Sequence, residues 1–239
     1  SNAPTHSEDF LKNGFTRVEN FLSAEVAELA YHYAQLRIRL GHARTPDEHQ
    51  FGAKIEYGDH LMESILEIAR PRIETIVGKS LWPTYALYRL YEAGMDLPPH
   101  TDRPACEYSA SICLGREQDE ESDPQDWPLF IAGTPVSCPP GTAVVYQGRK
   151  TSHWREPLPG GSQIQLFLKY VDRDGKWGKA CRYDGRISLG LPSSQRLPQQ
   201  KELLKQLLQP ETEKSLQRLL WFLALQAKVR FLRQKQDYY

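Results

Sequence analysis

The chain has 239 residues, of which 40% are hydrophobic and 25% charged, and this suits one large domain or one domain with an appendage. Lys plus Arg and Asp plus Glu each number 30, so the formal net charge is zero and the overall balance favours neither nucleic acid nor an acidic membrane surface. No apolar run approaches about eighteen residues and no charged-then-apolar leader is present, so we expect neither a membrane span nor a signal peptide.

The four cysteines are also informative, because they form no CxxC pair and no zinc-ribbon spacing: Cys106, Cys113, Cys138 and Cys181. In a chain of this size such cysteines are typical of reduced thiols, not of a disulfide framework. We therefore expect a cytoplasmic protein.

The N-terminal part is predicted to form a short strand and then a helix. Residues 14–22 alternate in polarity as a strand does, and Ser23 then caps a helix that runs to about residue 40. Apolar residues recur on this helix at three- and four-residue steps and form one apolar face: Val26, Leu29, Tyr33, Leu36 and Leu40.

A polar connection and a second helix follow. Residues 42–57 are expected to be a solvated connector, with a loop that covers a site as the alternative. The helix spans about residues 60–77, and Pro71 is expected to break or kink it near Arg70.

From residue 81 the pattern changes to short strands separated by Gly- and Pro-containing turns. The clearest strands are 85–91, 108–114, 127–132, 136–138, 141–146 and 162–171. With about seven or eight strands at this spacing, a β-barrel or sandwich is expected. Residues 116–126 are rich in acidic side chains and are predicted to be a solvated loop.

The C-terminal part is predicted to be an irregular segment followed by helices. Residues 175–197 are rich in Gly, Arg and Pro, and 201–208 and 211–233 have helical patterns with wide apolar faces. These helices must bury their apolar faces, either on the domain itself or at a homodimer contact. We therefore divide the chain into a β-domain, residues 4–174, and an extension, residues 175–239.

One short motif points to a metal site. His100 and Asp102 are separated by one residue, so on an extended segment both side chains project to the same side. His153 can supply a second imidazole. Two histidines and one carboxylate, with the opposite face open, are the ligand set that non-haem Fe(II) oxygenases use.

Longer motifs around this triad resemble the iron- and 2-oxoglutarate-dependent dioxygenases of the prolyl 4-hydroxylase type. The resemblance covers about residues 10–172 and leaves out the region after Asp174. Its motifs are Tyr91-Glu92-Ala93-Gly94-x-x-Leu97-x-x-His100-x-Asp102, Ser109-Ala110-Ser111-Ile112-Cys113-Leu114, Pro140-Gly141-Thr142-Ala143-Val144-Val145-Tyr146 and His153-x-x-x-Pro157-x-x-x-Gly161.

The resemblance implies a mainly β fold, a double-stranded β-helix (jelly-roll) with N-terminal helices, here with a C-terminal helical extension. It implies that His100, Asp102 and His153 hold Fe(II). It also implies that Tyr91 lines the pocket for 2-oxoglutarate, the co-substrate. The family's Lys or Arg for the distal carboxylate of 2-oxoglutarate falls at Gln163, which brings no charge.

Another cation should therefore bind that carboxylate, because a buried carboxylate without one is costly. Arg155 lies two residues after His153 and can face as it does, and a guanidinium can bind a carboxylate with two hydrogen bonds. Lys169 is the competing candidate, since it points to the same side of its strand as Gln163. Arg89 is the third. We favour Arg155.

The function that the resemblance implies is hydroxylation of an unactivated C–H bond with Fe(II), 2-oxoglutarate and O2, with ascorbate in a supporting role. The expected substrate is a small molecule or a peptide, with a prolyl or other amino-acid side chain as the family's commonest choice. An alternative is a cupin-like module that binds metal without turnover, and another is a scaffold protein with an inactive oxygenase fold. Nucleic acid and membrane partners are not expected, and the chain is expected to be a monomer or a homodimer through its C-terminal helices.

Overall fold

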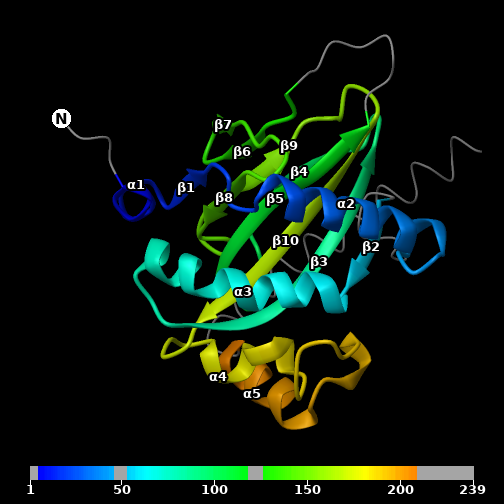
Figure 1. The fold of residues 1–239 in the computed structure, drawn as a ribbon. Helices are drawn as coiled ribbons and strands as arrows, with labels where there is room; N and C mark the ends of the chain where they lie inside the picture. The colour runs from blue at the N-terminus through cyan, green and yellow to red at the C-terminus, as the bar shows by residue number, and fades with distance from the viewer. Residues whose placement is uncertain (1–4, 46–52, 118–125, 209–239) are drawn as a thin grey trace, which may run out of the picture.

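The structure is a computed structural model that describes residues 5–45, 53–117 and 126–208 (Figure 1). The larger of two antiparallel sheets has the order β1-β8-β5-β10-β3-β2: Phe15–Val18, Ala143–Tyr146, Tyr108–Glu117, Ser162–Asp172, Leu81–Glu92 and Lys54–Tyr57. The smaller has the order β4-β9-β6-β7: Leu97–His100, His153–Arg155, Leu129–Ile131 and Thr134–Val136. This confirms the mainly β fold, and the arrangement is consistent with a jelly-roll.

The two sheets face each other across a buried interior. Val144 and Tyr146 of β8 share one apolar cluster with Leu129 and Ile131 of β6. Because side chains alternate along a strand, every second residue of β10 points into this interior: Gln163, Gln165, Phe167 and Lys169. The residues between them pack against helices on the outer face: Ile164, Leu166, Leu168 and Tyr170.

Helices α2 (Ala24–Arg39) and α3 (His60–Val77) cover that outer face, and α1 (His6–Asn13) precedes β1 (Figure 1). Ser23 and Asp59 cap the N-termini of α2 and α3 by accepting hydrogen bonds from backbone N–H groups of the first turn. No helix within the described residues is long and apolar enough to cross a membrane.

The structure corrects the face that α2 buries. Its buried residues are Ala27, Ala30 and Ala34, whereas Leu29 is 63% exposed and Leu36 is 56% exposed. A row of alanines lets the helix backbone lie close to the sheet. Gly115 of β5 shows how close: a Cβ there would come within 2.6 Å of the Tyr31 ring. Four members of the apolar stripe predicted from spacing are therefore exposed, namely Val26, Leu29, Leu36 and Leu40, and only Tyr33 packs against the core.

Two further details also differ from expectation. Helix α3 continues past Arg70 through Pro71, which is exposed, so the carbonyl that lacks an N–H donor there can be hydrated. The stretch predicted as a connector ends in β2, an edge strand that pairs with β3 and buries Ile55 and Glu56. Residues 46–52 and 118–125, the centres of two predicted loops, lie outside the described residues.

The described part of the C-terminal extension packs on the β-domain. It contains two helices, α4 (Gly178–Cys181) and α5 (Pro198–Leu208), and two short 3-10 helices, η2 (Arg182–Gly185) and η3 (Ser193–Gln195). A further 3-10 helix, η1 (Pro104–Cys106), lies between β4 and β5. Trp177, Leu203 and Leu204 share an apolar cluster with Tyr85 of β3 and Val171 of β10. The predicted helix 211–233 lies outside the described residues, so the homodimer stays a prediction.

Candidate metal centre

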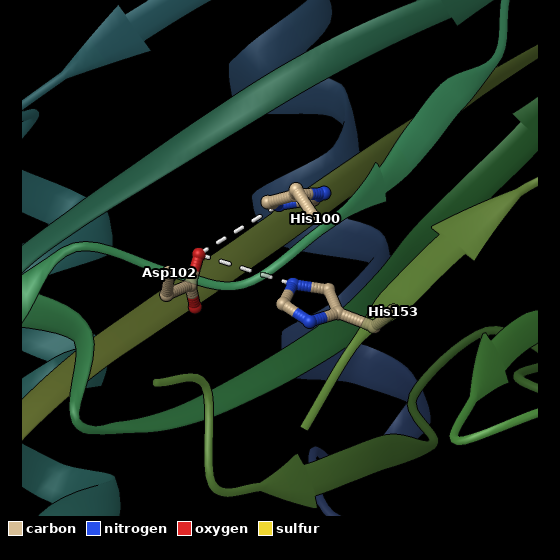
Figure 2. A group of neighbouring side chains, drawn as sticks. All are labelled: His100, Asp102 and His153. Carbon is tan, nitrogen blue, oxygen red and sulfur yellow. Dashed lines mark ion pairs between the residues drawn. The ribbon is translucent and has the colours of Figure 1, made fainter. Parts of the chain in front are cut away.

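The three candidate ligands lie together because two strands of the smaller sheet pair in a suitable register. His100, at the end of β4, is the cross-strand partner of His153, at the start of β9. Asp102 follows two residues after β4, and its Oδ1 lies 3.8 Å from Nε2 of both histidines (Figure 2). One ligand atom from each residue lies within 4.8 Å of the others, so a single metal ion can be shared by all three.

Backbone carbonyls orient both imidazole rings for metal binding. Nδ1 of His100 donates a hydrogen bond to Pro98 O at 2.8 Å, and Nδ1 of His153 donates to Thr151 O at 2.9 Å. A carbonyl oxygen can only accept, so the proton sits on Nδ1 and the lone pair of Nε2 faces Asp102. Burial lowers the pKa of His153 to about 4 and also lowers the pKa of His100, so both rings are neutral, as metal ligands must be.

The Asp102 carboxylate is held by one oxygen and presents the other. Its Oδ2 accepts hydrogen bonds from Lys169 Nζ at 2.9 Å and from Ser109 Oγ at 3.0 Å, while Oδ1 faces the histidines. Burial is the largest single influence and would raise the pKa of Asp102, but the charge and hydrogen bond of Lys169 together with the two histidines outweigh it, so the pKa is lowered. The carboxylate is therefore ionised and oriented.

Gly148 completes the wall behind this carboxylate. Its carbonyl accepts a hydrogen bond from the Asp102 N–H at 2.8 Å. A Cβ on this residue would lie 2.3 Å from Asp102 Oδ2 and 2.4 Å from the Cys106 carbonyl oxygen. Only glycine fits at this position, and sequence reasoning did not single it out.

A second group of predicted residues lies around Trp127. Arg155 is 1% exposed, and its guanidinium stacks over the Trp127 ring at 4.5 Å and donates from Nη1 to Trp127 O. The Trp127 ring contacts the Tyr91 ring edge-on, with centroids 4.9 Å apart. Nε and Nη2 of Arg155 are buried without a hydrogen-bond partner among the described residues.

Gln163 lies beside Tyr91, its cross-strand partner on β3. Its Nε2 donates to Gln165 Oε1 at 2.7 Å, and Gln165 Nε2 donates to Ser111 Oγ at 2.8 Å. The Oε1 atom of Gln163 is buried without a partner in the described part of the chain. Amide oxygen and nitrogen are assigned from the hydrogen-bond network; with both amides reversed, the Ser111 hydroxyl would donate to Gln165, Gln165 would donate to Gln163, and an N–H group of Gln163 would be left for an anion.

The structure thus separates the two favoured cations. Lys169 lies at Asp102, whereas Arg155 lies near Trp127 and Tyr91. Arg89, the third candidate, donates from Nη1 to the Tyr91 hydroxyl at 3.1 Å.

One further cation was missed from the sequence. Arg116 pairs across the strands with Gln163, but it falls in the stretch that the sequence predicted as the acidic loop. Strict alternation from Ser109, Ser111 and Cys113 leads to Gly115, and only the register shift between Ile164 and Gln165 brings Arg116 opposite Gln163. Burial raises the pKa of Cys113 to about 12, and the charges of Arg116 and Arg155 oppose this rise, so both guanidinium groups lie near the thiol. All four cysteines are buried and none forms a disulfide.

Solved structures of low sequence identity share this fold. A prolyl-4-hydroxylase of Pseudomonas putida matches with 20% identity and a TM-score of 0.56, over 70% of this chain and 97% of that chain. A prolyl hydroxylase from Trichoplax adhaerens, in complex with a hypoxia inducible factor peptide fragment, matches with 14% identity and a TM-score of 0.56, over 69% of this chain and 86% of that chain.

The match also extends beyond prolyl hydroxylases. The non-haem α-ketoglutarate dependent carbocyclase SnoK from nogalamycin biosynthesis matches with 13% identity and a TM-score of 0.58, over 80% of this chain and 93% of that chain. No protein-family model matches the chain, and no curated protein matches it. These structural likenesses show that the chain has the fold of the prolyl 4-hydroxylase-like 2-oxoglutarate–Fe(II) oxygenases.

Proposed function

We propose that the chain is a 2-oxoglutarate-dependent Fe(II) oxygenase that hydroxylates an unactivated C–H bond of a small molecule or peptide. His100, Asp102 and His153 would hold the metal, since they are the group of His, Cys, Asp and Glu side chains within the described residues that could share an ion. Two nitrogen ligands and one oxygen ligand suit Fe(II) and leave room for co-substrate and O2.

The observation that carries the proposal is the buried guanidinium of Arg155. A buried charged group whose N–H donors lack partners is costly, so a protein retains one where a ligand supplies the acceptors. The distal carboxylate of 2-oxoglutarate has the charge and the two oxygens to pair with Nε and Nη2. Tyr91, whose ring contacts the Trp127 ring, and Gln163, its cross-strand partner, would line the same pocket.

Lys169 has another role in this proposal. Its ammonium group holds Asp102 Oδ2 and so keeps Oδ1 directed at the metal. Fe(II), 2-oxoglutarate and O2 together supply the oxidation, in which 2-oxoglutarate is converted to succinate and CO2 and one oxygen atom enters the substrate. The protein groups orient the ligands, pair with the co-substrate and keep water from the site.

The substrate is proposed from the fold alone. The solved structures of similar fold include prolyl hydroxylases, one of them in complex with a peptide fragment, so a prolyl or other amino-acid side chain is the first class to test. Ascorbate is proposed as a supporting reductant, the cytoplasm as the location, and the four buried cysteines suit that location.

The test uses Fe(II) and 2-oxoglutarate with the full chain. Under anaerobic conditions the complex should develop the weak visible charge-transfer band between metal and co-substrate, and in air it should release succinate even without substrate. A His153→Ala variant serves as the control that lacks one ligand. Metal binding without the band and without succinate would support the cupin-like binding module instead, and no metal binding would sink both.

A further inference from the structure

The segment 178–208 lies outside the sequence motifs that resemble the oxygenases, yet it contacts the loop that carries a metal ligand. It sits at the lower end of β3 and β10 in Figure 1, where α4 and α5 are labelled. We propose that Asp184 of this segment is a positioning residue for the metal centre: it holds Arg103 and thereby the loop that places Asp102. This inference rests on the proposed function only in so far as it concerns metal binding.

The contact between Asp184 and Arg103 is a paired ionic contact. Arg103 Nη1 donates to Asp184 Oδ1 at 2.7 Å and Nη2 donates to Oδ2 at 2.9 Å. The Asp184 side chain is 4% exposed and that of Arg103 is 43% exposed, so water reaches the pair only from the Arg103 side. Tyr57 Oη, at 2.7 Å, and Arg196 Nη2 also donate to Oδ2, which fixes the carboxylate from three sides.

The backbone at Asp184 has an unfavourable conformation that the surrounding contacts must hold in place. Tyr183 and Asp184 both adopt the left-handed conformation, with φ of 51° and 56°, which side chains other than glycine rarely take. Such residues persist where surrounding contacts hold them. Here those contacts are the four donors on the carboxylate and the hydrogen bond that Arg186 Nε donates to Tyr183 O at 2.7 Å.

The loop that carries Asp102 and Arg103 has little regular structure of its own, so bonds to the rest of the protein hold it in place. Residues 101–107 connect β4 to β5 and contain only the short turn Pro104–Cys106 as regular structure. Arg103 follows Asp102 directly, so a shift of its backbone moves the ligand. The Arg103 guanidinium also lies over the Tyr85 ring, 4.7 Å from its centroid, which aligns it between β3 and Asp184.

A second ionic contact anchors the same segment elsewhere and provides a matched control. Arg186 Nη2 donates to Glu63 Oε1 at 2.6 Å and to Thr84 O at 3.0 Å, which ties the segment to α3 and β3. The side chains of Arg186 and Glu63 are 0% and 2% exposed. None of the hydrogen bonds that the structure gives these two residues involves the loop 101–107. Arg186 also contacts Tyr57 and Tyr183. The control therefore changes Glu63, which meets only the Nη groups of Arg186 and not the Nε group that donates to Tyr183 O.

The experiment compares Asp184→Asn with Glu63→Gln in the full chain. In metal-free protein, hydrogen exchange of the peptide that spans residues 100–107 should be about tenfold faster in Asp184→Asn, because Asn cannot accept the paired ionic contact. Mn²⁺, used because it is stable in air, should bind 10- to 100-fold more weakly, the usual effect of losing a partner that orients a metal ligand. Glu63→Gln should lower the melting temperature without changing either quantity.

Four outcomes of this experiment have to be distinguished. Wild-type exchange and wild-type Mn²⁺ affinity in Asp184→Asn would overturn it, as would equal losses in Glu63→Gln, since these would indicate general destabilisation. If Asp184→Asn does not fold, Arg103→Gln removes the same contact from its more exposed side and is read in the same way. If the wild type binds no Mn²⁺, the proposed function fails, and the exchange rates in metal-free protein still test the positioning role.

Discussion

The two buried cations of the interior are predicted to have separable roles, and replacing each by methionine tests this. Arg155→Met removes the group proposed to bind the distal carboxylate of 2-oxoglutarate, while Lys169→Met removes the group that holds Asp102 Oδ2. Methionine keeps much of the volume of either side chain but has neither charge nor N–H donors. The two variants should therefore fail at different binding steps.

The expected size of the Arg155 effect follows from its two unpartnered donors. A hydrogen bond to a charged group contributes roughly 1.5–3 kcal/mol, so losing two costs about 3 kcal/mol at the lower limit. This corresponds to a rise of about 100-fold in the dissociation constant of 2-oxoglutarate. Mn²⁺ affinity should stay at the wild-type value, because Arg155 contacts Trp127 and not the ligand atoms.

Lys169→Met should instead weaken the binding of the metal ion. Among the described residues this substitution leaves the Asp102 carboxylate buried with Ser109 as its remaining hydrogen-bond donor, and removing one partner of a buried ion pair costs about 3–5 kcal/mol of folding stability. Mn²⁺ affinity should fall by about 10- to 100-fold.

The assay is calorimetric titration of Mn²⁺, and then of 2-oxoglutarate into the Mn²⁺ complex, without O2. Lys150→Met, which removes an exposed cation three residues before His153, is the control for a simple change of charge. The assignment of roles is refuted if Arg155→Met binds 2-oxoglutarate normally, or if Lys169→Met keeps its Mn²⁺ affinity but loses 2-oxoglutarate.

Three further predictions concern the ligand loop, pH and the helix face. Gly148→Ala should abolish Mn²⁺ binding, because its Cβ would lie 2.3 Å from Asp102 Oδ2; normal titration would show that the loop can move away. The pKa of His153 falls from 6.5 to about 4 on folding, so the metal-free protein should lose about 3 kcal/mol of stability as pH drops from 6.5 to 4, where only the unfolded state takes up the proton. Urea unfolding measures this loss, and an unchanged pH slope in His153→Gln would contradict it. On α2, Ala30→Leu should cost about 1–3 kcal/mol by overpacking, whereas Leu29→Ser should change stability by less than about 0.5 kcal/mol; similar melting temperatures for both would refute the corrected face.

The sequence was sufficient for features that depend on local spacing. His100 and Asp102 are two residues apart on an extended segment, and alternation along β10 predicts that Gln163 and Lys169 face the same way; the structure places all of them as these spacings indicate. The mainly β fold was also predictable, since strand periodicity and turn residues are properties of short stretches.

Spacing was insufficient where the answer depended on what a residue packs against. On α2 the apolar stripe with Leu29 and Leu36 has helical periodicity, but the sheet accepts the smaller alanine face because close approach of the backbone buries more of the helix. Periodicity identifies a stripe and cannot say which stripe has a partner.

The roles of the cations depended on tertiary structure for a related reason. Lys169 and Asp102 are 67 positions apart and meet only because β10 lies beside β5 and the β4–β5 loop folds back over it. Likewise, Arg155 becomes a buried donor because Trp127, 28 positions earlier, covers it. Local sequence specifies which way a side chain points along its own strand, whereas the neighbour it meets is specified by the register between strands, which only the folded chain contains.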